Sequence, residues 1–240
     1  MKRGFALLLL ALTAASAPPH KVARNTPALE FDYEWPAEAA AIPALDLRLY
    51  NEAKRNLAEA QKNAREDQAL AKQQKRDFNP HDYSMTWTME GETPRLLSLS
   101  SNLGSFEGGA HPNSNYGSML WDRQLNREIG LNALFATSAQ FAAASRTSYC
   151  KKLNAERAKR REGENLDLPE FNACPKYSEL AIYPVEKNRN GRFDRVTFMA
   201  SPYVAGPYVE GEYEISVPVT AQLIAALKPQ YRASFEVQRQ

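Results

Sequence analysis

LEFDYEW, the stretch Leu29–Trp35, alternates apolar with acidic side chains, which is the period of a half-buried strand. The stretch LDLRLYNEAKRNLAEAQKNAREDQALAKQQKRD that follows at Leu45–Asp77 contains no glycine or proline. Its apolar residues recur at spacings of three and four or their sum, at Leu49, Ala53, Leu57, Ala60, Ala64 and Ala71. This pattern predicts a long N-terminal amphipathic helix after a strand. Residues 18–27, before the strand, are polar and proline-rich and predict a loose lead-in.

Further along the chain, glycines separate short stretches that are typical of strands. Gly91 and the pair Gly108-Gly109 lie where a tight turn needs positive φ, so the first three stretches predict an antiparallel meander. The predicted strands are Asp82–Glu90, Arg95–Phe106, His111–Asp122, Glu179–Val185, Arg192–Ala200, Tyr208–Val217 and Arg232–Val237. The predicted helical segments are Asn126–Phe135 (a turn and a short helix), Ser138 to Arg157 or beyond, and Pro218–Leu227. We therefore expect an α+β fold of antiparallel sheets, each half packed with helices.

The first residues have the three parts of a secretory signal peptide. Lys2 and Arg3 precede an apolar run at 5–12, and Ala15-Ser16-Ala17 forms a small-residue cleavage site. The run is too short to span a membrane, and the other reading is an ordinary buried N-terminal helix. The sequence thus predicts a signal peptide at residues 1–17, no stable membrane span, and a periplasmic or secreted chain.

Composition and cysteine usage narrow the class of protein further. Without residues 1–17 the chain has 28 basic and 28 acidic residues, which argues against nucleic acid as a partner. The two cysteines of the chain, Cys150 and Cys174, predict a disulfide in an exported protein. A redox pair or a metal site is the alternative, although neither cysteine has a neighbouring Cys or His.

No motif of an enzyme class is present. The chain has three histidines, His20, His81 and His111, and it lacks a nucleophile elbow, a phosphate-binding loop, a dinucleotide fingerprint and a zinc-protease motif. We therefore assign no catalytic residue, no metal ligand and no cofactor, and binding is favoured over catalysis.

The segment FEGGAHPN at Phe106–Asn113 is the first candidate for a site. Its glycines let the backbone turn sharply, and the proline holds His111 extended. The side chains could contact a ligand, or they could only hydrogen-bond the local backbone of an inter-strand corner. The candidate ligand-binding residues here are Glu107, Gly108, Gly109, His111 and Asn113.

The second candidate is SPYVAGPYVEGE at Ser201–Glu212, which is dense in Tyr, Pro and Gly. Such a composition forms a rigid aromatic loop that presents flat surface at low entropy cost. The aromatic residues could instead cap the end of a sheet. The candidate ligand-binding residues are Tyr203, Gly206, Tyr208 and Glu210. We expect this loop and the glycine corner to meet in space and to form one binding surface.

At these two segments the sequence resembles the PdaC/RsiV-like superfamily. Residues 107–113, Trp121-Asp122 and Leu131–Phe135 resemble the start of its C-terminal domain of unknown function, and residues 202–211 with the following strand and helix resemble the end. The resemblance implies a PdaC-like N-terminal domain at 18–105 and an RsiV-like C-terminal domain at 106–240, with a disulfide-closed insertion at 150–174. The catalytic domain of the PdaC deacetylase is a separate one that is not recognised here.

RsiV-like proteins are anti-sigma factors whose extracellular portion binds lysozyme. The resemblance therefore implies a binding protein for a cell-envelope ligand such as lysozyme, another cell-wall hydrolase or peptidoglycan glycan. The rival hypothesis is a hydrolase that acts on envelope glycan or ester, with Glu107 and His111 as acid/base pair together with Asp122 or Glu210. A purely structural envelope protein is the third possibility.

Overall fold

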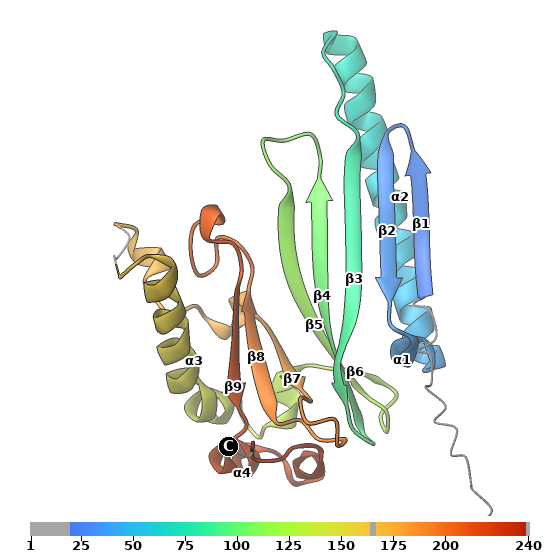
Figure 1. Ribbon diagram of the computed structural model, residues 1–240. Coiled ribbons are helices and arrows are strands. Elements are labelled where there is room, and N and C mark those ends of the chain that lie inside the picture. Colours follow the sequence, from blue (N-terminus) through green and yellow to red (C-terminus); the bar gives the residue numbers. More distant parts are fainter. Residues whose placement is uncertain (1–19, 164–166, 239–240) are drawn as a thin grey trace, which may run out of the picture.

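The computed structural model of the chain describes residues 20–163 and 167–238 (Figure 1). Two β-sheets form its centre, and its two longest helices, α2 (Pro43–Gln74) and α3 (Ser138–Arg160), lie on opposite sides of them. The predicted α+β class and the long N-terminal helix are confirmed. The predicted signal peptide lies outside the described residues.

The larger sheet has six strands in the order β1-β2-β3-β4-β5-β6. Their bounds are β1 His20–Thr26, β2 Leu29–Trp35, β3 His81–Glu92, β4 Leu96–Phe106, β5 Asn113–Asp122 and β6 Arg127–Ile129. The predicted meander of β3, β4 and β5 is confirmed. All neighbours are antiparallel except β2 and β3, which run parallel because the short α1 (Ala37–Ala40) and the long α2 carry the chain back along the sheet. The predicted domain division at residue 105 falls at the end of β4, and it stays a prediction.

The predicted loose lead-in was wrong for residues 20–26, which form the edge strand β1. Its residues pair antiparallel with β2, from His20 opposite Trp35 to Thr26 opposite Leu29. Side chains of β1 are exposed or half-buried, so the strand has no apolar alternation for a sequence pattern to detect. Pairing with the apolar β2, a tertiary interaction, decides its conformation.

A first hydrophobic core lies between the larger sheet and α2. The apolar side of β2 faces the apolar stripe of the helix, as the two periodicities predict. Its buried residues include Leu29, Phe31, Tyr33 and Trp35 of β2 and Leu45, Leu49, Ala53, Leu57 and Ala64 of α2. The helix ends at Gln74, three residues before the predicted end, because Lys75 takes the left-handed conformation with φ 51°.

The smaller sheet has the order β7-β8-β9 and is antiparallel throughout. The strands are β7 Ala181–Val185, β8 Arg195–Ala200 and β9 Tyr213–Pro218, and the short helix α4 spans Ala221–Ala226. A second core joins this sheet to α3, with Phe141, Tyr149 and Leu153 of the helix packed with Phe198 and Tyr213. Each sheet is therefore covered by one of the two long helices.

Two predicted strands of the C-terminal part differ from the structure. Arg232–Val237 is no strand: residues Pro229–Ser234 form a 3-10 helix, with a single bridge from Phe193 to Phe235. The strand predicted at Tyr208–Val217 begins only at Tyr213, because Tyr208–Glu210 form a 3-10 turn. In both places residues typical of strands are buried or fixed by neighbouring segments without a partner strand, and this overrides their propensity.

The two sheets meet where β7 crosses β3, β4 and β5. At this junction the backbone N–H of Glu186 donates to the Glu90 carbonyl oxygen at 2.9 Å. A side chain at Gly91 would collide with the Glu186 backbone, so glycine is required there. Beyond this close contact, the two sheets lie side by side. The β4–β5 loop and the β8–β9 loop lie at the same end of the molecule (Figure 1).

Candidate functional site

The two segments predicted to form a surface lie against each other. The His111 ring stacks on the Tyr208 ring with centroids 4.1 Å apart and planes 27° apart. The Tyr208 hydroxyl donates to the Pro112 carbonyl oxygen at 2.8 Å, across 96 residues of sequence. Tyr203 extends the aromatic group, with its ring centroid 5.6 Å from that of Tyr208. We call His111, Tyr203, Tyr208 and the adjoining Val209 the aromatic platform.

The platform exposes large apolar side chains. Tyr203 is 56% exposed and Val209 is 89% exposed, although apolar side chains of this size are usually buried. Tyr203 also has a φ of 70°, a conformation that a bulky side chain rarely adopts. Backbone strain of this kind gathers at binding and active sites, where the surrounding structure holds it in place.

Residues 201–212, between β8 and β9, carry Tyr203, Tyr208 and Val209, and we call them the platform loop. Polar contacts with β5 fix the start of this loop. The Ser201 hydroxyl donates to Asn115 Oδ1 at 2.8 Å, and the Tyr116 N–H donates to the Ser201 hydroxyl at 3.0 Å. These bonds tie the loop to the first residues of β5, next to the glycine corner. The relative position of the two segments is thus set by hydrogen bonds as well as by ring stacking.

The predicted ligand residues Glu210 and Gly206 support the loop from inside. The carboxylate of Glu210 accepts two hydrogen bonds from Arg161, at 2.8 and 2.9 Å, and a third from the Tyr213 hydroxyl. Burial would raise the pKa of Glu210, but the hydrogen bonds from Arg161 and Tyr213 lower it below its usual value. Gly206 is buried beneath this carboxylate, and a Cβ there would collide with it. Both residues therefore shape the platform loop without facing outward.

The other predicted residues of the glycine corner face elsewhere. Glu107 is exposed and lines a cavity of about 270 Å³ against α2, together with Glu59 and Tyr83. Gly108 provides the turn with a φ of 77°. His111 uses its Nδ1–H to donate to the Pro112 carbonyl oxygen at 2.8 Å. Glu107 thus lies toward α2 while His111 lies against the β8–β9 loop, and the two make no pair.

Gly109 and Asn113 complete the corner. Nothing lies within 4 Å of the place where a Cβ of Gly109 would be, and Asn113 is exposed at the first position of β5. Both lie at the turn end of the β4–β5 hairpin, each two residues from His111 in the sequence. Their neighbours in the structure give neither residue a further role.

Asp122, the remaining carboxylate of the hydrolase hypothesis, is buried at the opposite end of β5. Its Oδ2 accepts hydrogen bonds from Arg95 at 3.0 and 2.9 Å and from the Tyr231 hydroxyl at 3.3 Å. Burial would raise the pKa of Asp122, but the hydrogen bonds from Arg95 and from the backbone N–H of Leu125 lower it. These contacts give the carboxylate a structural role.

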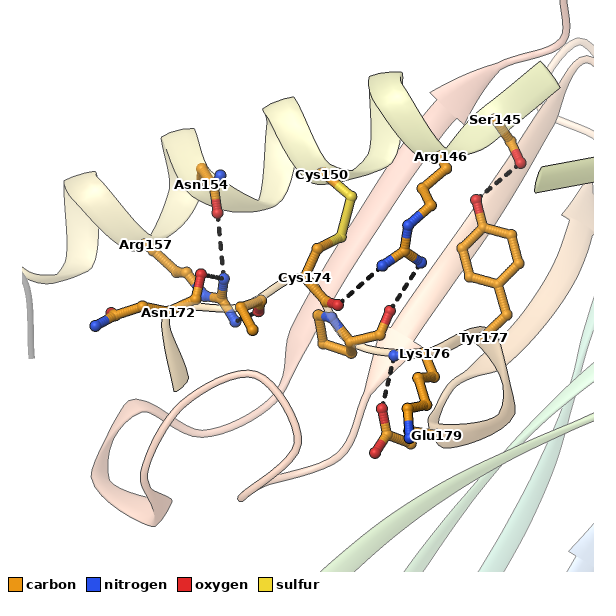
Figure 2. Close-up of a disulfide and its surroundings, with 12 residues drawn as sticks. Ser145, Arg146, Cys150, Asn154, Arg157, Asn172, Cys174, Lys176, Tyr177 and Glu179 are labelled. Atoms are coloured by element: carbon orange, nitrogen blue, oxygen red, sulfur yellow. Dashed lines mark hydrogen bonds between the residues drawn. A yellow bond between two sulfur atoms is a disulfide. The ribbon is translucent and has the colours of Figure 1, made fainter. Parts of the chain in front are cut away.

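The predicted disulfide between Cys150 and Cys174 is confirmed (Figure 2). It links the segment 172–177, which we call the strap, to α3, and two arginines of the helix bind the same segment. Arg146 donates to the carbonyl oxygens of Cys174 and Pro175, and Arg157 donates to those of Asn172 and Ala173.

Arg157 also connects this strap to the platform loop. Its Nε donates to the Ala205 carbonyl oxygen at 2.9 Å, and Arg161, one turn further along, holds Glu210. Both arginines come from the charged stretch 151–164, where no sequence pattern distinguishes them from their neighbours, so sequence reasoning missed their role. The disulfide-braced α3 is therefore the support of the aromatic platform.

A groove between the two sheets was also missed. It has a volume of about 360 Å³ and is lined by residues of β3, β4, β5, β7, β8 and β9: Thr86, Thr88, Glu90, Ser100, Ser101, Asn102, Tyr116, Gly117, Tyr183, Met199 and Glu214. No local pattern could have revealed it, because it takes one or a few residues from each of six strands. Tyr116 lies both in the groove and beside Ser201, so the groove begins next to the platform.

In residues 20–163 and 167–238, no cluster of three or more His, Cys, Asp or Glu side chains could hold a metal ion. Among the same residues, no helix has the length and apolar character needed to cross a bilayer.

Comparison with known proteins finds a family match in the N-terminal part of the chain and a similar fold over most of its length. Residues 22–114 match the family model described as deacetylase PdaC. No curated protein matches the chain. This match confirms the resemblance of the N-terminal part to PdaC, and two crystal structures share the fold of the chain.

Both crystal structures are of DUF3298 family proteins. The one from Bacteroides fragilis is 15% identical, with a TM-score of 0.54, and the alignment covers 90% of this chain and 95% of that one. The one from Pseudomonas aeruginosa is 17% identical, with a TM-score of 0.52, and the alignment covers 92% of this chain and 97% of that one. At such identities the likeness establishes the fold alone.

Proposed function

We propose that the chain is an exported binding protein that captures a cell-wall hydrolase of the lysozyme class on the aromatic platform. The observation that carries the proposal is the stack of His111 on Tyr208 beside the exposed Tyr203 and Val209. Aromatic side chains dominate the energetics of protein interfaces because each buries a large area at a small cost in entropy. An exposed group of them at the end of two sheets therefore supports a binding role.

The platform is held rigid before any partner arrives. Arg157 and Arg161 anchor its base to α3, and Tyr208 is bonded to Pro112. Such preorganisation raises affinity, because less conformational entropy is lost on binding. The resemblance to RsiV-like proteins, whose extracellular portion binds lysozyme, supplies the class of partner.

The hydrolase hypothesis has less support from the geometry. Asp122 and Glu210 each form an ion pair with an arginine. Glu107 and His111 contact different elements. A glycoside hydrolase needs two carboxyl groups on either side of one substrate position. The positions of these four residues favour binding over that chemistry.

Two features of the chain support export. The disulfide between Cys150 and Cys174 is of the kind that persists in oxidising compartments. The N-terminal residues have the sequence pattern of a secretory signal. A periplasmic or secreted location would place the platform where cell-wall hydrolases act.

Isothermal titration calorimetry of the exported chain with lysozyme tests the proposal. We expect binding that Val209→Asp weakens by at least about 30-fold, because a charge in the centre of an apolar interface costs about 2 kcal/mol or more. Leu125→Asp is the matched control: Leu125 is 46% exposed on the β5–β6 turn, away from the platform, and its substitution should leave binding unchanged.

Binding to peptidoglycan fragments in place of lysozyme would move the proposal to a glycan partner. The absence of heat with both would overturn it. Equal weakening by Val209→Asp and Leu125→Asp would show that binding does not use the platform.

A further inference from the structure

The groove between the sheets is a second place that can hold a ligand. Its volume of about 360 Å³ lies within the range of roughly 300 to 1,000 Å³ that is usual for small-molecule sites. Tyr183, a buried residue of β7, lines it from one sheet, and Ser100 of β4 lines it from the other. The site is thus built from both sheets and depends on their packing.

The charges of the groove select the charge of its ligand. Glu90 of β3 and Glu214 of β9 both line it, and the described residues around the groove include no lysine or arginine. Glu90 is half-buried and accepts a hydrogen bond of 2.5 Å from the Ser100 hydroxyl. Burial raises the pKa of Glu90, and the negative charge of Glu214 raises it further. A positively charged group between these carboxylates would stabilise the ionised form of Glu90 and so act against both effects.

The remaining lining selects a ligand that is rich in hydroxyl groups. Five hydroxyl-bearing side chains and one amide line the groove: Thr86, Thr88, Ser100, Tyr116, Tyr183 and Asn102. Hydroxyl groups both donate and accept hydrogen bonds, so they match a ligand that does the same. The half-buried ring of Tyr116 adds flat apolar surface on which a sugar-like ring can lie.

We propose that the inter-sheet groove binds a small hydroxylated amine of the amino-sugar class, with its ammonium group between Glu90 and Glu214. Charge-assisted hydrogen bonds from the ammonium group to the carboxylates supply the attraction, and the hydroxyl side chains orient the ring. This site goes beyond the capture of a protein on the platform, since it uses a different surface and a different class of ligand. Tyr116, which lines the groove and is bonded to Ser201, lies between the two sites.

Calorimetry of the full exported chain with glucosamine, N-acetylglucosamine and glucose at about pH 7 tests the site, because only glucosamine carries an ammonium group. We expect glucosamine to bind with a Kd at least about tenfold below those of the two neutral sugars. Glu214→Gln should raise that Kd at least about tenfold, and Glu90→Gln should do so as well. The matched control Glu30→Gln, at an exposed position of β2, should leave it unchanged.

Circular dichroism melting of each variant shows whether it is folded, and the two groove variants guard against the failure of either. Equal affinity for the three sugars, no heat with glucosamine, or unchanged affinity in both folded groove variants would overturn the proposal. Calcium binding in place of glucosamine would also overturn it. Val209→Asp lies outside the groove and should bind glucosamine normally, so failure of this site and failure of the lysozyme proposal are distinguishable.

Discussion

Arg161 and Glu210 form a two-point ion pair at the base of the aromatic loop, with Nε 2.8 Å from Oε1 and Nη2 2.9 Å from Oε2. The side chains are only 5% and 9% exposed. A bidentate pair of this kind fixes both distance and orientation. It therefore joins the end of α3 to the loop that carries Tyr203 and Tyr208.

Removal of Arg161 should destabilise the fold strongly. Arg161→Ala leaves the Glu210 carboxylate buried without its cation, which typically costs about 3 to 5 kcal/mol. Urea denaturation measures the loss in the free energy of unfolding. The double variant Arg161→Met with Glu210→Met should lose less than Arg161→Ala, because no buried charge remains.

Lys159→Ala is the control for Arg161→Ala. Lys159 is exposed on the same turn of α3, so its substitution should change the free energy of unfolding by less than about 0.5 kcal/mol. A loss in Arg161→Ala no larger than in Lys159→Ala would show that the ion pair contributes nothing.

Loss of the disulfide should lower the stability of the protein without unfolding the strap. Replacement of Cys150 and Cys174 by serine together should lower the free energy of unfolding by about 3 kcal/mol, the chain-entropy value for a loop of this length. Arg146 and Arg157 still hold the carbonyl oxygens of the strap, so the variant should stay folded. Denaturant unfolding with and without a reductant measures the effect.

The reductant provides its own control. It should lower the stability of the natural chain to that of the double serine variant and should leave the variant unaffected. Equal stability of the two chains in the absence of reductant would contradict a stabilising role for the disulfide.

Acidification should destabilise the protein through Asp122 and Glu210. The pKa of each is lowered in the folded state, so their stabilising effect is present above the unfolded pKa of about 4 and is lost as the pH falls through the lower folded pKa. The raised pKa of Glu90 acts in the opposite direction: its stabilising effect is present below its unfolded pKa and is lost as the pH rises through the folded pKa. Protonation of Asp122 and Glu210 also removes their charge-assisted hydrogen bonds with Arg95 and Arg161, so the free energy of unfolding should decrease as the pH is lowered below about 4.

Urea denaturation at a series of pH values measures this dependence. Asp122→Asn should reduce the loss of stability on acidification, since the titrating group at Arg95 is gone. An unchanged pH dependence in that variant would rule out Asp122 as a source of the acid sensitivity.

Individual elements show what a local sequence pattern can predict and what it cannot. The alternation in Leu29–Trp35 and the helical spacing in Leu45–Asp77 predicted β2 and α2, because each pattern records which side of an element is buried. The polar β1 was missed, since an exposed edge strand leaves no such record. Arg232–Val237 was assigned wrongly because β-forming residues there pack without a partner strand.

For the candidate site, the sequence predicted the outward-facing aromatic residues but not the residues that fix their positions. His111, Tyr203 and Tyr208 were named from the composition of two loops, and the structure places their rings together. Glu210 was named for ligand contact, yet its carboxylate is held by Arg161. An ion pair between residues 49 positions apart leaves no trace in either local pattern.

The sequence by itself determined the strands and helices whose burial is periodic, and it identified the disulfide, because two cysteines allow one intrachain pairing. Only the tertiary structure decided that β2 and β3 run parallel, that the two loops share one platform and that Glu90 and Glu214 line one groove. The physical reason is that periodicity reports which side of an element faces a core. The direction of pairing and the meeting of distant loops depend on how the two sheets pack across each other.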